Sequence, residues 1–206
     1  MADWSALREW SRTVARLEVS ERQLEQLRRY VDLLLVWNRK VALVSQRDAN
    51  AILAKHVADS LFVAANCPPA RSIADLGSGA GFPGIPIAIA NPSTRVCLIE
   101  SRGKKVSFLE EVRRCIRLEN CEIFHGRIEA AAAAHGQIHD LVVSRALTAP
   151  NRLIPLGCSL LAPGGRLVVM LSSGDANSET DSGRISYVLP DGTPRELRIL
   201  RHTNDG

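Results

Sequence analysis

Three features are missing from this sequence of 206 residues, and each absence excludes a class of protein. No apolar run approaches the roughly 18 residues of a membrane-spanning helix, and the charged first ten residues lack the apolar core of a signal peptide. The five cysteines are odd in number, and none of them forms a pair or a Cys/His cluster at zinc-ligand spacing. We therefore expect a cytoplasmic monomer with reduced thiols, no metal and no membrane partner.

The catalytic groups of common hydrolases are also missing, because no Ser/His/Asp set and no acid/base pair occurs at a recognisable spacing. Lys and Arg number 26 against 22 Asp and Glu, which gives a net charge of +4 and a pI near 9.0. Such an excess permits nucleic-acid binding without requiring it. The hydrophobic fraction of 46% is enough for a sizeable core, and the length fits one domain with a helical extension.

The most informative stretch covers residues 75–84 and reads DLGSGAGFPG, between a short apolar run and a helix-like segment. Glycine lacks a Cβ atom, so it permits positive φ and lets backbone amides face a ligand at the positive end of the following helix. The pattern predicts a strand, a glycine turn and a helix, which together outline a nucleotide site. Read alone, Gly79-x-Gly81-x-x-Gly84 also matches the fingerprint of NAD-dependent dehydrogenases.

Two carboxylates favour S-adenosylmethionine (SAM) over NAD as the ligand. Asp75 ends the first strand, where it would repel a pyrophosphate but attract the cationic amino acid end of SAM. Glu100 ends the next apolar strand, where a carboxylate can accept both ribose hydroxyls. Together with Gly77, Gly79 and Gly81, these acids predict a cofactor site rather than a purely structural turn.

The pattern of apolar residues changes at Pro68 and Pro69, since prolines end helices. Before this pair the chain reads as helical, and after it short apolar runs alternate with helical segments. We therefore predict an N-terminal helical cap over residues 1–68 and a SAM-binding domain over residues 69–206, packed as one compact unit.

Within the cap, a capping box at Ser20 predicts the start of an amphipathic helix. A further helix is predicted over residues 49–65, where Lys55 and Asp59 are four positions apart and can pair on one face. His56 in the same helix reads equally well as a functional residue or as a hydrogen-bonded structural histidine.

After the prolines, strands and helices alternate. Strands are predicted over residues 73–76, 96–99, 122–124, 141–143 and 167–171, and helices over 84–90, 104–118, 128–134 and 151–161. Such alternation predicts an α/β fold with a mainly parallel sheet covered on both faces, and ligands bind beyond the carboxyl ends of its strands. The tail reads differently, as a loop over residues 172–183 and a hairpin of residues 185–189 and 196–200.

Specific short motifs surround the glycine stretch, and its flanking prolines are the most distinctive part. In chain order they are Trp37-Asn38, Lys55-His56-x-x-Asp59-Ser60, Phe82-Pro83-Gly84-Ile85-Pro86, Glu100-Ser101-x-x-Lys104-Lys105, His125-Gly126-Arg127-x-Glu129, Ser144-Arg145-Ala146 and Pro163-Gly164-Gly165-Arg166. With these motifs the chain resembles the small-subunit ribosomal RNA guanine-N(7) methyltransferases, also called glucose-inhibited division protein B.

The resemblance implies a class I SAM-dependent methyltransferase fold, Rossmann-like, with an N-terminal helical extension. Carried over position by position, it implies SAM contacts at Gly77, Phe82, Ile128, Glu129 and Arg145. Asp75, Gly79, Gly81 and Glu100 join this set from the arguments above. Arg145 is expected to orient the cofactor or the guanine. No general base is expected, because guanine N7 carries a free lone pair and needs only alignment and a dry site.

The partner implied is small-subunit ribosomal RNA or the small subunit itself, whose phosphates need cations around the target base. The candidates for these contacts are Arg39, Lys40, Arg102, Lys104 and Lys105. Three further arginines, Arg113, Arg114 and Arg117, are spread around the same helix, so a solvated surface explains them at least as well.

The chain departs from the family pattern at the cap and in the tail. It has Ala42-Leu43-Val44 where the family has Asn-Leu-Thr, and Ser172-Ser173 where the family has Lys-Gly. Two alternatives to an RNA methyltransferase therefore stay open. One is a SAM-dependent methyltransferase for another acceptor, and the other is a SAM-binding ribosome assembly factor without turnover.

Overall fold

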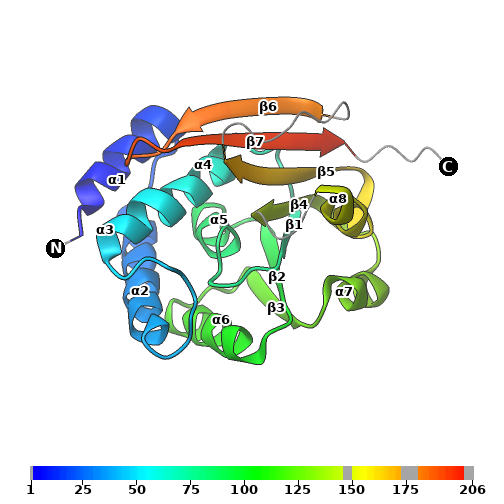
Figure 1. Cartoon of the computed structure of the whole chain (residues 1–206), viewed down its shortest axis with the longest axis horizontal. Helices are drawn as coiled ribbons and strands as arrows, with labels where there is room; N and C mark the ends of the chain where they lie inside the picture. Colours follow the sequence, from blue (N-terminus) through cyan, green and yellow to red (C-terminus); the bar gives the residue numbers. More distant parts are fainter. Residues whose placement is uncertain (1, 146–149, 173–180, 202–206) are drawn as a thin grey trace.

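The computed structural model describes residues 2–145, 150–172 and 181–201 and builds them on a seven-stranded sheet in the order β3-β2-β1-β4-β5-β7-β6 (Figure 1). The strands are β1 Ser72–Leu76, β2 Arg95–Glu100, β3 Cys121–His125, β4 His139–Arg145, β5 Leu161–Ser172, β6 Asp181–Val188 and β7 Pro194–Arg201. Strands β1 to β5 pair in parallel, and β7 pairs antiparallel with both β5 and β6. The predicted α/β fold with a mainly parallel sheet is confirmed.

Helices cover both faces of this sheet, with α7 and α8 on one face and α2, α5 and α6 on the other (Figure 1). The helical elements are α1 Trp4–Trp10, η1 Ser11–Ala15, α2 Glu21–Asn38, α3 Ala49–Ile52, η2 Leu53–Val57, α4 Ala58–Asn66, α5 Gly84–Ala90, α6 Gly103–Cys115, α7 Ile128–His135 and α8 Pro150–Cys158. No helix within the described ranges is both long and apolar enough to cross a membrane.

Two cores form because successive side chains of a strand point to opposite faces. On β2, Leu98 joins the larger core under α2, α5 and α6, which also holds Tyr30 and Phe108. Its neighbour Ile99 joins the smaller core under α7 and α8, together with Leu153. The buried sheet with helices on both faces leaves the carboxyl ends of its parallel strands as the place for a ligand.

The capping box at the start of α2 is confirmed, with Ser20 Oγ accepting from Gln23 N at 3.3 Å and Gln23 Oε1 accepting from Ser20 N at 2.9 Å. The same helix is bonded to the parts that shape the glycine loop. The Gln23 amide donates to Ile89 O at the end of α5, and the Tyr30 hydroxyl donates to Ala80 O at 2.6 Å. Helix α2 of the cap therefore holds the glycine loop in place through the Tyr30 hydrogen bond.

The predicted helix over residues 49–65 is divided into α3, the π-helical turn η2 and α4. A π turn bonds residues five apart, so it holds one more residue than an α turn. The predicted pair between Lys55 and Asp59 is wrong. Lys55 Nζ lies 3.8 Å from Asp191 instead, and Asp59 is buried with 1% of its surface exposed.

Two further predictions, for the end of helix α8 and for the loop over residues 172–183, differ from the structure. Helix α8 ends at Cys158, and β5 already begins at Leu161 and continues to Ser172. The predicted loop over residues 172–183 is wrong at both ends, which belong to β5 and β6, while residues 173–180 lie outside the described part of the chain. The predicted hairpin is confirmed by the antiparallel pairing of β6 with β7.

Candidate cofactor and acceptor site

A cavity of about 380 Å³ opens beyond the carboxyl ends of β1, β2 and β3, a size typical of small-ligand pockets. It is lined by Gly77, Ile99, Glu100, Ser101, Arg102, Lys105, Gly126, Arg127, Ile128 and Glu129. Four of these residues, Gly77, Glu100, Ile128 and Glu129, are predicted cofactor contacts. Arg102 and Lys105, two predicted RNA contacts, line the same cavity.

The glycine loop owes its shape to three left-handed residues, because Gly77, Gly79 and Gly81 have φ of 67°, 59° and 93°. A Cβ atom on Gly81 would lie 2.7 Å from Ile85, which leaves no room for a side chain. Gly77 N donates to Ile99 O at 2.9 Å, so the loop is fixed to the end of β2. Of the three, Gly77 lines the cavity, and the other two hold the turn.

Glu100 is buried and holds the two sides of the cavity together. Its Oε2 accepts from Gly79 N at 2.9 Å, and its Oε1 accepts from Arg102 N at 2.8 Å. Each carboxylate oxygen has a second lone pair, so both can still accept a hydroxyl. The carboxylate is thus fixed in place at the cavity wall, and it fits the ribose diol of SAM.

Asp75 is buried at the start of α5 and does not line the cavity. Its Oδ2 accepts from Gly84 N at 3.0 Å, whereas its Oδ1 has no hydrogen-bond partner in the described structure. A Cβ atom on Gly84 would lie 2.7 Å from that Oδ2, so glycine is required for this approach. Burial raises the pKa of Asp75 to about 7. The structure therefore shows Asp75 supporting the helix start, and its contact with SAM stays a prediction.

A second group of side chains meets the glycine loop through Phe82, whose ring stacks on His56 at 5.0 Å between centroids and an angle of 22°. Arg145, at the end of β4, donates from Nη1 to His56 Nδ1. His56 Nε2 bonds to Gln46 Oε1 at 2.7 Å. Burial lowers the pKa of His56 to about 3, helped by the nearby Arg145, so the ring is neutral. This geometry requires the proton on Nε2 and leaves Nδ1 as the acceptor.

Asp59 organises the cations of this group. Its Oδ2 lies 3.7 Å from Nε of Arg145 and 3.7 Å from Nε of Arg195, and its Oδ1 accepts from the Tyr187 hydroxyl. Burial raises the pKa of Asp59, although both arginines and the hydroxyl act in the opposite direction. With His56 neutral, two guanidinium groups face one carboxylate. We call His56, Asp59, Arg145, Tyr187 and Arg195 the cation cluster; it carries a net positive charge.

Two members of the cation cluster were missed by sequence reasoning, because Tyr187 and Arg195 lie on the hairpin strands β6 and β7. The hairpin pattern predicted the strands, but no local motif marks either side chain as part of a site. The remaining predicted residues are placed apart from the cavity. Phe82 and Arg145 belong to the cation side, and Arg39, Lys40 and Lys104 are exposed and do not line the cavity.

Comparison with known proteins identifies the relatives of this chain. Residues 23–193 match the family model described as rRNA small subunit methyltransferase G, GidB. A protein named ribosomal RNA small subunit methyltransferase G from Chloroflexus aggregans is 37% identical over 199 residues, which cover 89% of this chain and 84% of that protein. One of the same name from Anaeromyxobacter is 39% identical over 173 residues, covering 84% and 78%.

Solved structures share the fold at low sequence identity. An O-methyltransferase from Bacillus cereus in complex with SAH aligns with a TM-score of 0.61 and 14% identity, over 97% of this chain and 98% of that one. A putative O-methyltransferase from Klebsiella pneumoniae aligns with a TM-score of 0.59 and 12% identity. The predicted class I methyltransferase fold is confirmed, and the chain belongs to the rRNA small subunit methyltransferase G family.

Proposed function

We propose that this protein transfers the methyl group of SAM to N7 of a guanine in small-subunit ribosomal RNA. Membership of the family makes it a SAM-dependent methyltransferase, and its relatives are named as methyltransferases of small-subunit ribosomal RNA. One observation carries the proposal for this chain: a small-ligand cavity and the cation cluster meet the glycine loop that holds Phe82.

The cavity side is proposed to hold the cofactor. Glu100 would accept the ribose hydroxyls, and Gly77, Ile128 and Glu129 would line the remaining surface. SAM supplies a methyl group attached to a positively charged sulfur. Because the glycine loop and Glu100 are bonded to each other before any ligand arrives, this side is preorganised for binding.

The cation side is proposed to hold the guanine. The stacked rings of His56 and Phe82 offer a flat surface of the kind on which proteins stack unpaired bases. Arg145 has donors that suit guanine O6, the acceptor next to N7. Hydrogen bonds and ion pairs to His56 and Asp59 hold its guanidinium, so its direction is set before the base arrives.

The reaction needs alignment rather than proton removal. The N7 lone pair forms the new bond to the methyl carbon while the bond from that carbon to sulfur breaks, and the sulfur keeps the electron pair. The positive charge moves from sulfur to the guanine ring, so the protein needs no proton acceptor for this step. Neutral His56 is consistent with this scheme, since the scheme asks it to stack and to hold Arg145 rather than to take a proton.

We also propose that the helical cap, residues 1–68, and the SAM-binding domain, residues 69–206, contribute different parts of the site. The cap supplies His56 and Asp59 to the guanine side, and the remainder supplies the cofactor cavity. Arg102 and Lys105 at the cavity, with the exposed cations Arg39, Lys40 and Lys104, are the proposed contacts to RNA phosphates.

The test is transfer of labelled methyl from SAM to small ribosomal subunits isolated from cells lacking this gene, followed by mapping of the labelled nucleoside. A single 7-methylguanosine is expected. Arg145→Met should abolish transfer while calorimetry still shows SAM binding, and Arg152→Met, a change outside the site, serves as the control. SAM binding without transfer to any subunit by the unaltered protein would favour the assembly-factor alternative.

A further inference from the structure

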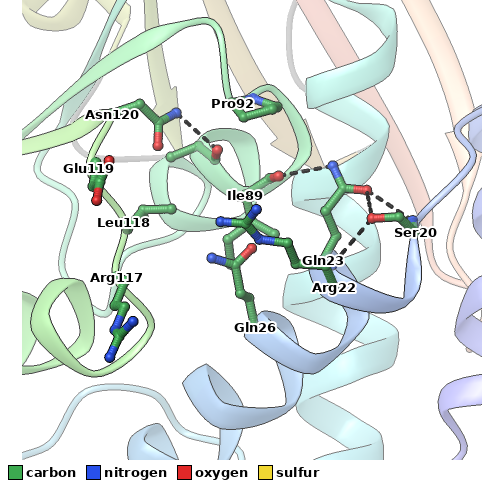
Figure 2. A pocket seen from close by; sticks show the side chains of 11 residues that line it. Ser20, Arg22, Gln23, Gln26, Ile89, Pro92, Arg117, Leu118, Glu119 and Asn120 are labelled. Atoms are coloured by element: carbon green, nitrogen blue, oxygen red, sulfur yellow. Dashed lines mark hydrogen bonds between the residues drawn. The ribbon is translucent and has the colours of Figure 1, made fainter.

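A second groove lies at the opposite end of the parallel strands, between the start of α2 and the turn that joins α6 to β3 (Figure 2). Its volume is about 480 Å³, and the apolar side chains Ile89, Pro92 and Leu118 line it beside Arg22 and Arg117. Helix α6 begins next to the cofactor cavity and ends at this groove. Its 13 residues, at about 1.5 Å each, separate the two places by about 20 Å.

Three amide side chains fix the walls of this groove, as the dashed bonds in Figure 2 show in part. Gln23 Nε2 donates to Ile89 O at 3.0 Å, and Gln26 Nε2 donates to Ile116 O at 2.9 Å. Asn120 Nδ2 donates to three carbonyl groups at the end of α5 and in the turn after it, at 2.9 to 3.2 Å. Each amide ties one wall to another, so the groove is preformed rather than a gap between mobile side chains.

The arginines around this groove are not equivalent. On α2 and along the end of α6, four of them are engaged locally: Arg28 lies over the Trp4 ring, Arg29 pairs with Glu25, Arg113 with Glu110 and Arg114 with Glu111. In the described structure Arg22 and Arg117 have no ion pair or side-chain hydrogen bond, and both line the groove and the cavity adjoining it. Among the described residues that line the groove, Glu119 is the one carboxylate, so the lining keeps a positive excess.

The backbone at Arg117 gives a second, independent reason to single out this residue. Leu118 N donates to Arg113 O at 3.0 Å, and Arg117 N donates to Arg114 O at 3.4 Å, which is the pattern that ends a helix in a Schellman motif. The residue between these bonds is left-handed, with φ of 51°, and glycine is favoured there. The chain instead holds an arginine in an unfavourable backbone conformation at the rim of the groove.

We propose that this groove binds backbone phosphates of the RNA substrate through Arg22 and Arg117. The proposal rests on the proposed function, and it adds an RNA contact remote from the methyl transfer. Guanidinium groups form charge-assisted hydrogen bonds with phosphate, and RNA presents many phosphates within the 20 Å or so that separate groove and cavity. Helix α6 then carries an RNA contact at each end, with Arg102 and Lys105 at its start.

The test measures binding of Arg22→Gln and Arg117→Gln to small ribosomal subunits, and to protein-free small-subunit RNA, over a range of salt concentrations. Each substitution should lower the slope of log affinity against log salt by about 1, and the double variant by about 2. Arg29→Gln and Arg114→Gln are matched controls, because their partners already neutralise them, and their slopes should match the unaltered protein. SAM binding and methyl transfer at saturating subunit should stay unchanged.

Arg117→Gly separates a binding role from an inert surface charge. Glycine suits the left-handed backbone, so the melting temperature should rise by about 2 to 4 °C, while RNA affinity should fall as in Arg117→Gln. If the salt dependence of binding is unchanged and methyl transfer is intact, the proposal that the groove binds RNA is refuted, whereas the proposed function stands. Weaker binding to subunits but not to free RNA would also overturn it, in favour of an acidic protein partner. Absence of any RNA binding by the unaltered protein would refute both the proposed function and the RNA-binding role of the groove.

Discussion

Asp59→Asn is the substitution that tests the cation cluster most directly. Asp59 has 1% of its surface exposed and lies 3.7 Å from each of two guanidinium groups. The arginine side chains are themselves largely buried, with 21% exposed in Arg145 and 17% in Arg195. Asparagine keeps the shape and an oxygen for the Tyr187 hydroxyl but removes the charge. Two like charges would then face each other without a carboxylate.

The expected loss of stability follows from these distances. At 3.7 Å and an effective dielectric constant of about 20, each ion pair contributes about 4 kcal/mol of Coulomb attraction before desolvation is subtracted. Removing one partner of a buried pair typically costs about 3 to 5 kcal/mol, because the other charge is left buried and unpaired. The burial that raises the pKa of Asp59 offsets part of that cost, so we expect the free energy of unfolding to fall by about 1 to 3 kcal/mol in Asp59→Asn.

Urea denaturation at pH 7 with unchanged m-value measures this loss. Asp191→Asn is the matched control: its pair with Lys55 at 3.8 Å is more exposed, so it should lose less than about 1 kcal/mol. Arg195→Met should cost less in the Asp59→Asn background than in the unaltered protein, with a coupling energy of about 1 to 3 kcal/mol. A loss below about 1 kcal/mol, or strictly additive losses, would refute the role given to Asp59.

Three further predictions concern the cofactor side. Gly81→Ala should lower the free energy of unfolding by about 2 to 4 kcal/mol, because φ is 93° and the new Cβ would lie 2.7 Å from Ile85; a normal thermal melt would contradict this. Glu100→Gln should weaken SAM binding at least about tenfold by calorimetry, because one oxygen that accepts from the Gly79 or Arg102 amide becomes a donor; equal affinity would remove Glu100 from the site. Burial raises the pKa of Asp75 to about 7, so this carboxyl group binds its proton more tightly in the folded than in the unfolded protein, and the free energy of unfolding should fall as pH rises from about 4 to 7. Asp75→Asn should flatten this pH dependence, and an identical pH profile for the variant would contradict the argument.

Part of the site could be read from the sequence because its causes are local. Gly77 to Gly81 sit between a strand and a helix, and a backbone with positive φ favours glycine. Glu100 ends the adjacent parallel strand, so its approach to the glycine loop follows from sheet order. For Asp75 the predicted contact with SAM stays a prediction, because strand-end position does not determine which way a carboxylate turns. Its Oδ2 turns to the amide of Gly84.

The cation cluster could not be read in this way, since its members meet through tertiary packing. Lys55 lies near Asp191, between β6 and β7, and buried Asp59 faces two arginines; nothing in residues 53–57 indicates these distant partners. Arg195 and Tyr187 arrive from an antiparallel hairpin that a regular pattern of strands predicts, but pairing alone does not reveal which side chains turn toward α4.

The charge balance of the cation cluster connects its stability to its proposed function. Asp59 is the one carboxylate that faces both Arg145 and Arg195, and His56 is neutral, so the folded protein holds a positive charge that its own described side chains leave uncompensated. Keeping such a charge partly buried is costly, and a fully neutralised cluster would be more stable. A phosphate brought to the cluster compensates that charge, a guanine O6 accepts a hydrogen bond from it, and binding to the folded state alone adds stability by mass action. The excess positive charge that destabilises the free protein therefore favours binding of the nucleotide. Asp59 sets the size of this excess charge, because it neutralises one arginine and leaves the other available.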